Sequence, residues 1–305
     1  MDTINVYNRL AENIKVEHIL KDEPMHKHTS FKIGGPVDIM VLPNSVKEVQ
    51  YAIKVCKEFD IDYYVIGNGS NLLVLDGGIR GIVIKIAEYF NGVEIKGNRV
   101  TAQAGILLSS LANRMMKEGL KGFEFASGIP GTLGGAVTMN AGAYGGEMKD
   151  LLVGVHLIDD QGEVIYLKAE ELELGYRSSV IQKKGFIVLS AEMEFEEGNC
   201  DEIKEKIKDF TNRRTTKQPL HLPSAGSTFK RPVGYFAGKL IEDAGLKGVR
   251  VGGAQVSPLH SGFIVNVDHA TAADVIHLIK MVQKTVRDRF DVVLHSEVKV
   301  IGEAK

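Results

Sequence analysis

The sequence predicts an α+β protein folded as two or three packed units, and three observations lead to this prediction. The chain has 305 residues, which is more than a single hydrophobic core usually accommodates. Segments with helical periodicity alternate with segments of strand character. Glycine is concentrated in two segments, 67–71 and 128–147, and the 44% apolar content is that of an ordinary folded protein.

The first unit is predicted from a helix, a strand, a glycine loop and a second strand. Ser45 can cap the helix, with Glu48 three residues later. A buried stripe follows the helical period at Val46, Val49, Ile53, Cys56 and Phe59. The strands are YYVI (63–66) and GIVIKI (81–86).

A second unit is predicted to begin at VTAQAG (100–105) and to end near Phe195. Its helix carries Leu107, Leu108, Leu111 and Met115, and Gly119 can terminate it in the left-handed conformation. The run VHLIDDQGEVIYL (155–167) predicts a hairpin that turns at residues 160–162.

A third, α/β unit is predicted after the polar break GNCDE (198–202). It opens with a helix spaced by Ile203, Ile207 and Phe210, whose basic end (Arg213, Arg214 and Lys217) suits the helix dipole. Further helices are expected at about 235–244 and 271–288, and strands at about 250–256, 262–267 and 292–301.

Composition excludes several classes of function. The 37 basic and 39 acidic residues give a net charge of −2, which argues against a sequence-independent grip on nucleic acid. Cys56 and Cys200 are far apart and have no metal-spaced partners, which disfavours a disulfide framework or a zinc site. The N-terminus lacks a signal-peptide core, and no apolar stretch reaches the roughly 18 residues of a membrane span. We therefore expect a cytoplasmic protein.

The loop VIGNGSNLLV places two glycines and three small polar residues directly after a strand, at Gly67, Asn68, Gly69, Ser70 and Asn71. Its N–H groups and side chains could surround phosphate oxygens, or the loop could be a tight turn between strands. The third glycine of the dinucleotide fingerprint is missing, and no GxxxxGK[ST] occurs. A Rossmann domain and a P-loop are both disfavoured.

The segment GIPGTLGGAVTMNAGAYGGE (128–147) is the stronger indication of a ligand site. A merely flexible loop would interleave serine, aspartate and lysine, whereas this segment interleaves Ile129, Leu133, Val137, Met139 and Tyr144. So many glycines are costly in chain entropy. The mixture favours a buried loop folded around a large flat ligand.

The sequence resembles the UDP-N-acetylenolpyruvoylglucosamine reductases, the MurB family, within the wider class of vanillyl-alcohol-oxidase-type flavoproteins. The matching stretches follow the family's order from residue 28 to 302. They are HTSFKIGGP (28–36), GNGSNLL (67–73), FASGIPGTLGGAVTMNAGAYGGE (125–147), YRSS (176–179), PSAGSTFKRP (223–232) and SEVKVIG (296–302).

The resemblance implies a two-subdomain, PCMH-type FAD-binding domain at 18–88 and 89–197, and a smaller α/β substrate-binding domain at 203–302. The 67–71 loop would lie on the FAD pyrophosphate and the 127–147 segment along the flavin. FAD would be non-covalent, because no flavin-linking His or Cys is evident, and no metal is implied. The implied cofactor residues are Gly67, Asn68, Gly69, Ser70, Asn71, Ser127, Gly128, Pro130, Gly131, Gly134, Gly135, Asn140, Gly142, Ala143, Tyr144 and Gly145.

The implied reaction is the reduction by NADPH, through FAD, of the enolpyruvyl group of a UDP-sugar to a lactyl ether, a step towards peptidoglycan. Hydride adds to the CH2 carbon and a proton to the carbon that bears the carboxylate. The enzyme therefore needs a hydride carrier, groups that hold the carboxylate and a proton donor.

The resemblance assigns Arg177 and Glu297 to the carboxylate and Ser227 to proton donation. Arginine can bind two carboxylate oxygens and stays charged. Glutamate beside an anion is sensible only if it is protonated or bonded to Arg177. Without the resemblance, an ion-paired surface arginine, a solvated strand carboxylate and a turn serine are the ordinary interpretations.

Weaker assignments concern substrate binding by Tyr176, Lys217 and Lys230. The stretch SVIQKKGFIV (179–188) is short and lacks the tyrosine that covers the sugar nucleotide in longer-loop relatives, so this chain resembles the shorter-loop subtype. Arg231 stands where some relatives have a polar amide. His28 and His260 receive no role, and a monomer is expected.

Two other functions stay open from the sequence. Another oxidase or dehydrogenase of the same flavin class would explain the glycine loops but not the order of Arg177, Ser227 and Glu297. A flavin or nucleotide-sugar binding protein without turnover is the second alternative.

Overall fold

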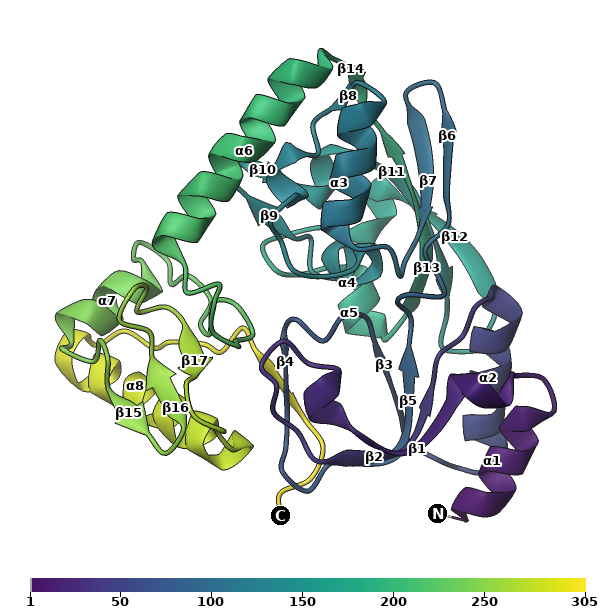
Figure 1. Cartoon of the computed structure of the whole chain (residues 1–305), viewed down its shortest axis with the longest axis horizontal. Coiled ribbons are helices and arrows are strands. Elements are labelled where there is room, and N and C mark those ends of the chain that lie inside the picture. Colours follow the sequence, from purple (N-terminus) through teal and green to yellow (C-terminus); the bar gives the residue numbers. More distant parts are fainter. Residues whose placement is uncertain (1) are drawn as a thin grey trace. The chain divides into compact units, whose positions relative to one another are not determined.

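A computed structural model describes residues 2–305, and the chain separates into two compact units (Figure 1). The first unit contains residues up to Leu20, Ile39–Asn68 and Ile82–Arg214. The second contains Lys21–Asp38, Gly69–Gly81 and Thr215–Lys305. Each unit has its own hydrophobic core. Within residues 2–305, no helix is both long and apolar enough to cross a membrane.

A four-stranded sheet has the strand order β1, β2, β5, β3, and two helices accompany it. Its strands are β1 (Ile19–Pro24), β2 (Pro36–Val41), β5 (Ile79–Lys85) and β3 (Tyr63–Ile66); the helices are α1 (Thr3–Ala11) and α2 (Val46–Glu58). The Ser45 side chain accepts a hydrogen bond from the N–H of Glu48 at 3.3 Å, which confirms the predicted cap of α2. The apolar stripe of α2 is buried, with Val49 and Ile53 in the core of the first unit.

The first unit also holds a five-stranded antiparallel sheet in the order β12, β11, β13, β7, β6. The strands are β6 (Val93–Lys96), β7 (Arg99–Gln103), β11 (Leu152–Ile158), β12 (Val164–Lys168) and β13 (Ile187–Glu194). The predicted hairpin is confirmed, since Ile158 pairs with Val164. The helices of this region are α3 (Leu108–Lys117), α4 (Leu133–Thr138), α5 (Val180–Lys184) and α6 (Cys200–Lys217). Gly119, at φ +68°, follows α3 as predicted.

The second unit is built from short strands and two helices. Strand β4 (Leu72–Val74) pairs in parallel with β18 (Lys299–Ile301). A three-stranded antiparallel sheet joins β15 (Arg250–Val251), β16 (Ala254–Val256) and β17 (Ile264–Asn266), and the helices are α7 (Ala237–Asp243) and α8 (Ala272–Phe290). The small paired strands β8 (Leu120–Lys121) and β14 (Glu196–Glu197) belong to the first unit.

Two predicted strands of the second unit differ from the structure. The expected strand at 250–256 is a hairpin, because Gly252 takes φ +52° and a Cβ on Gly253 would lie 2.2 Å from the carbonyl oxygen of Asp268. The expected strand at 292–301 is regular only over β18, where β4 supplies a partner, with an isolated bridge at Ser296. Apolar periodicity indicates neither a turn made by glycine nor where a partner strand ends.

Candidate functional site

The 67–71 loop joins β3 to β4. Neighbouring atoms lie so close to its backbone that both Gly67 and Gly69 must be glycine. A Cβ on Gly67 would lie 2.1 Å from Thr132 Oγ1. Gly69 has φ +61°, and a Cβ there would lie 2.1 Å from the carbonyl oxygen of His28. Any side chain at either position would clash. The loop is therefore fixed in shape by its own packing.

The segment 128–147 is not one continuous loop, which corrects the sequence interpretation. It contains α4 and then a hairpin of β9 (Gly142–Ala143) and β10 (Gly146–Glu147). Tyr144 and Gly145 form the hairpin turn at φ +53° and +89°, the backbone that a two-residue turn requires.

Three of its glycines are needed for packing against the protein itself. A Cβ on Gly134 would lie 2.9 Å from Ala104 Cβ, one on Gly142 would lie 2.7 Å from the carbonyl oxygen of Gly146, and one on Gly146 would lie 2.6 Å from the Phe125 ring. Gly135 differs, because it is exposed and its nearest contact would be Thr132 Oγ1 at 3.8 Å. Open space therefore remains at Gly135.

Asn140 is a buried structural centre of this segment, with only 1% of its surface exposed. Its Nδ2 donates to Glu147 Oε2 at 2.6 Å and to the carbonyl oxygen of Gly175 at 3.2 Å, and its Oδ1 accepts from the N–H of Lys149 at 3.0 Å. The side chain thus joins the glycine-rich segment to the turn that carries Arg177.

Arg177 lies in a tight turn whose ends are paired, since the N–H of Gly175 donates to the carbonyl of Ser178 at 3.0 Å. Its φ of +53° is uncommon for a residue with a side chain. Ser179 Oγ and Gln182 Nε2 both donate to the carbonyl oxygen of Thr138, at 2.6 and 2.8 Å. The end of α4 therefore anchors this turn. Strained backbone of this kind is frequent at functional sites.

The Arg177 guanidinium lies over the Tyr176 ring, with 5.1 Å from Cζ to the ring centroid. Tyr176 is 57% exposed, which is unusual for a large aromatic side chain.

Two other predicted site residues lie outside this turn. Lys217 is exposed at the last residue of α6. Among the other predicted cofactor residues, Ser127 donates its hydroxyl to the carbonyl of Glu124 at 2.8 Å.

In the second unit, the motif that contains Ser227 (PSAGSTFKRP, 223–232) lies between the segment of Phe263 and the segment of Glu297. Ser227 forms a bridge with Phe263, and the N–H of Glu297 donates to the carbonyl of Thr228 at 2.8 Å. Gly226 turns the chain into this position with φ +75°. Ser227 is exposed whereas Thr228 and Phe229 are buried. The predicted Ser227 and Glu297 therefore lie on adjacent segments, with Lys230 further along the serine motif.

The end of the 67–71 loop contacts the same segment. Asn71 Nδ2 donates to the carbonyl oxygen of Glu297 at 3.1 Å, and the N–H of Lys299 donates to the carbonyl of Asn71 at 3.0 Å. The fold thus brings a predicted phosphate-binding residue and a predicted catalytic residue together.

Lys299 is a candidate anion-binding residue that the sequence did not indicate. It lies two residues after Glu297, and alternate residues of an extended chain face the same side. Although much of the residue is exposed, partial desolvation, and then the charge of neighbouring Lys230, lowers the pKa of Lys299. Neither lysine forms an ion pair with residues 2–305, so this part of the second unit suits an anion. The only feature of the sequence that could have indicated Lys299 is its spacing of two residues from Glu297.

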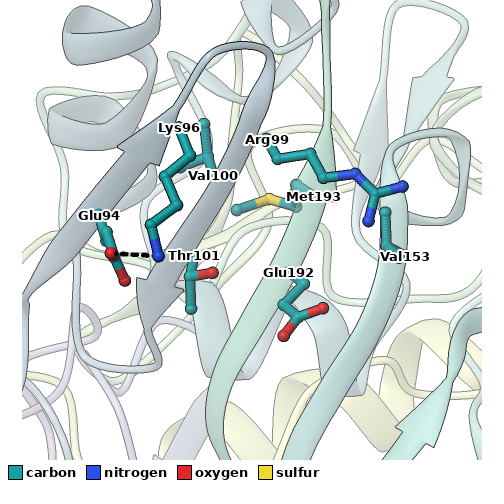
Figure 2. A pocket seen from close by; sticks show the side chains of 8 residues that line it. All are labelled: Glu94, Lys96, Arg99, Val100, Thr101, Val153, Glu192 and Met193. Carbon is teal, nitrogen blue, oxygen red and sulfur yellow. Dashed lines mark ion pairs between the residues drawn. The ribbon is translucent and has the colours of Figure 1, made fainter.

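A hollow on the outer face of the five-stranded sheet contains none of the predicted residues. Figure 2 shows its lining by Glu94, Lys96, Arg99, Val100, Thr101, Val153, Glu192 and Met193. The Lys96 ammonium pairs with the Glu94 carboxylate at 2.7 Å. Its charged lining is typical of the solvated face of an antiparallel sheet.

Two features of the first unit fit a flat anionic cofactor such as the FAD that the resemblance implies. Open space lies at Gly135, close to Thr132 and therefore to Gly67. The Nε of Arg214 is buried and has no hydrogen-bond partner within residues 2–305. A Cβ on Gly128 would lie 3.0 Å from Arg214 Cδ, so this cation lies against the glycine-rich segment.

Comparisons with known proteins agree with these features. A family model described as an FAD binding domain matches residues 37–168, and the C-terminal domain of UDP-N-acetylenolpyruvoylglucosamine reductase matches residues 218–301. The UDP-N-acetylenolpyruvoylglucosamine reductase of Alkaliphilus oremlandii is 62% identical, over 99% of this chain and 100% of that protein. The protein of the same name from Clostridioides difficile is 54% identical over the same shares.

A solved structure is also similar over most of its length. The UDP-N-acetylenolpyruvylglucosamine reductase (MurB) from Thermus caldophilus matches with a TM-score of 0.79 at 35% identity. The match covers 92% of this chain and 97% of that chain.

Proposed function

This chain belongs to the family of UDP-N-acetylenolpyruvoylglucosamine reductases, and we propose that Ser227, Arg177 and Glu297 act on the substrate in its reaction. The protein is an FAD-dependent oxidoreductase of peptidoglycan precursor synthesis, with NADPH as co-substrate. Its α+β fold combines the FAD-binding domain and the family's C-terminal domain. The observation that carries the residue assignment is the pairing of the Ser227 motif with the segment of Glu297.

We further propose which parts of the chain bind FAD and which bind the UDP-sugar. Residues 18–88 and 89–197 hold FAD, and residues 203–302 hold the UDP-sugar, with Lys217, Lys230 and Tyr176 among its contacts. The cofactor contacts are those named from the sequence, with Gly135 and Gly128 as the positions best supported by open space and by a neighbouring cation. The enzyme acts as a cytoplasmic monomer.

The chemistry divides between the cofactor and the chain. Bound FAD supplies the transfer of hydride from NADPH to the substrate. The chain must bind the enolpyruvyl carboxylate, where negative charge grows during reduction, and must deliver a proton to the carbon beside it. These two tasks call for a fixed cation and a group that can give up a proton.

Arg177 suits the carboxylate because its planar guanidinium can hold both oxygens and remains charged. The anchors to Thr138 hold the backbone of the turn that carries the guanidinium. Glu297 is proposed to act on the same carboxylate, which is chemically sensible only if Glu297 is protonated or hydrogen-bonded.

Ser227 is the proposed proton donor. A serine hydroxyl is a weak acid in water, so donation requires that neighbouring groups stabilise the alkoxide. Lys230 and Lys299 supply positive charge in this part of the second unit, and neither is paired with a carboxylate of residues 2–305. Such donation contributes about 10²- to 10⁴-fold to a rate.

The experiment that tests this proposal compares Ser227→Ala with the wild type in anaerobic stopped flow. NADPH should bleach the yellow wild-type protein, and the enolpyruvyl sugar nucleotide should restore its colour. In Ser227→Ala, bleaching should proceed at the wild-type rate, whereas recovery should slow by about 10²-fold or more. Ser109→Ala, on the exposed side of α3, is the control that should change neither half of the reaction.

The outcomes separate the competing functions. Equal loss of both halves in Ser227→Ala contradicts its role as proton donor. Wild-type protein that bleaches but never recovers with the sugar nucleotide supports an oxidase or dehydrogenase of another substrate. Binding of the sugar nucleotide without any bleaching by NADPH supports a binding protein without turnover.

A further inference from the structure

Two amide side chains hold the turn that carries Arg177 by hydrogen bonds to its backbone. Asn140 follows α4 in the chain, and its Nδ2 donates to the carbonyl oxygen of Gly175, at the start of the turn, at 3.2 Å. Gln182 lies in α5, and its Nε2 donates to the carbonyl oxygen of Arg177 itself at 3.3 Å and to that of Thr138 at 2.8 Å. Figure 1 shows α4 next to α5, the two helices that the Gln182 side chain joins.

The hydrogen-bonding groups of the Asn140 side chain face the protein. Because a carboxylate only accepts hydrogen bonds, the bond to Glu147 Oε2 at 2.6 Å fixes which end of the amide carries the N–H groups. The same Nδ2 donates to Gly175, and Oδ1 accepts from the N–H of Lys149 at 3.0 Å. The residue is only 1% exposed. Its side chain therefore acts on the turn, and a contact of residue 140 with FAD would come from its main chain.

These bonds oppose a relaxation of the turn. Arg177 takes φ +53°, which is strained for a residue with a side chain. A change to negative φ would rotate the neighbouring peptide groups and move the Arg177 side chain with them. The bonds to the carbonyl groups of Gly175 and Arg177 would then be lost. The position of the guanidinium therefore depends on Asn140 and Gln182.

We propose that Asn140 and Gln182 are positioning residues, which hold the Arg177 guanidinium where the enolpyruvyl carboxylate binds. The inference rests on the proposed role of Arg177 in binding that carboxylate. Helix α4 also carries Gly135, beside the open space that suits the flavin. The end of α4 and the residues that follow it thus set the position of the arginine relative to the cofactor. A small displacement of a group that binds substrate is enough to slow a reaction.

The first test measures both half-reactions of the holoenzyme with Gln182→Met, which keeps the side-chain length but loses the N–H donors. Bleaching by NADPH should keep the wild-type rate, because the role of Arg177 concerns the enolpyruvyl carboxylate. Recovery of colour with the enolpyruvyl sugar nucleotide should slow by about tenfold, the effect of one lost hydrogen bond. Gln50→Met is the control, because it removes a bond of the same kind, from Gln50 Nε2 to the carbonyl oxygen of Gly162 at 3.0 Å. It should change neither half-reaction.

Asn140 is tested by an exchange with its partner. The double variant Asn140→Asp with Glu147→Gln preserves the hydrogen bond between these two side chains in the opposite direction, but it has no N–H for the Gly175 carbonyl. It should therefore slow the recovery of colour and leave bleaching unchanged, as Gln182→Met does. Wild-type recovery in either variant overturns the assignment of that residue.

A double-mutant cycle separates positioning of Arg177 from an independent effect. In an Arg177→Ala background no guanidinium remains to be positioned, so Gln182→Met should slow recovery by less than about twofold there. A further tenfold loss would overturn the proposal. Slower bleaching in Gln182→Met, or slower recovery in Gln50→Met, would also overturn it, because each indicates a general disturbance of the fold. The proposed function fails by a different result, which is unchanged recovery in Arg177→Ala alone.

Discussion

Arg177 combines a functional side chain with a costly backbone. A non-glycine residue at φ +53° loses roughly 1–3 kcal/mol relative to a relaxed conformation. The anchors from Ser179 and Gln182 to Thr138 hold the turn in this shape. Glycine would adopt this left-handed backbone at lower cost. The presence of arginine at this position therefore indicates that its guanidinium has a function.

Two substitutions at Arg177 separate these contributions. Arg177→Ala and Arg177→Gly both remove the guanidinium, so both should abolish most of the turnover of the enolpyruvyl substrate. The glycine variant should be more stable than the alanine variant by about 1 kcal/mol, since glycine tolerates the left-handed backbone. Urea denaturation and steady-state kinetics measure the two effects.

Tyr176 provides the matched control in the same turn, because its backbone does not take a positive φ. There the order should reverse, with Tyr176→Gly less stable than Tyr176→Ala by roughly 0.5–1 kcal/mol. The same order at both positions would contradict the strain assigned to Arg177.

At the scale of elements, the start of α8 concentrates hydrogen-bonding groups. Thr271 and Asp274 form a capping box, and Asp76 accepts from the N–H groups of Ala272 and Ala273 at 2.8 and 3.1 Å. The N–H groups of Thr271 and Gly253 also donate to the Asp274 carboxylate, at 3.0 and 3.2 Å. These bonds favour the charged carboxylate.

A pH dependence follows for Asp274. The backbone N–H of Thr271, the largest influence, lowers the pKa of Asp274 below its usual value of 3.8 in the folded protein. The stabilisation is therefore present above about pH 4 and is lost as the pH falls through the lowered pKa. Asp274→Asn should destabilise the protein at pH 6, and this penalty should shrink progressively as the pH falls below 3.8.

Thermal melts at several pH values test this expectation. Asp288→Asn, on the exposed part of the same helix, is the control and should have little effect at pH 6. Absence of a penalty for Asp274→Asn at pH 6 would show that the carboxylate charge contributes nothing to the cap.

At the scale of the whole molecule, two separate hydrophobic cores divide the chain. The first unit holds most of the residues proposed to contact FAD, among them Gly67, Asn68 and Gly135. A bound cofactor stabilises the folded form that binds it.

Removal of FAD should therefore lower the melting temperature. A free FAD concentration about 100-fold above Kd stabilises the folded protein by about 2.7 kcal/mol, so the melting temperature should rise again as FAD is returned to the apoprotein. Differential scanning fluorimetry measures the shift, with riboflavin, which lacks the diphosphate and adenosine, as the comparison. Equal shifts with FAD and riboflavin would contradict a role for the 67–71 loop in holding phosphate.

The sequence was sufficient for the features that depend on local chemistry. Apolar periodicity and the Ser45 cap located α2, and Gly119 marked the end of α3 because only glycine takes that backbone without strain. The ordered motifs from residue 28 to 302 identified the family, which the comparisons confirm.

Other features depended on contacts between residues distant in sequence, which no local pattern contains. The glycines at 134, 142 and 146 suggested ligand contact, and only the structure shows that protein packing also requires them. Glu297 and Lys299 lie beside Asn71 only because the parallel pairing of β4 and β18 brings their segments together. In the sequence Arg214 is an ordinary helix-end cation, and burial against Gly128 without a carboxylate makes it a candidate for binding an anion. The sequence by itself thus determines residue types and local backbone preferences. Tertiary packing decides which polar groups are buried and which groups they bond to.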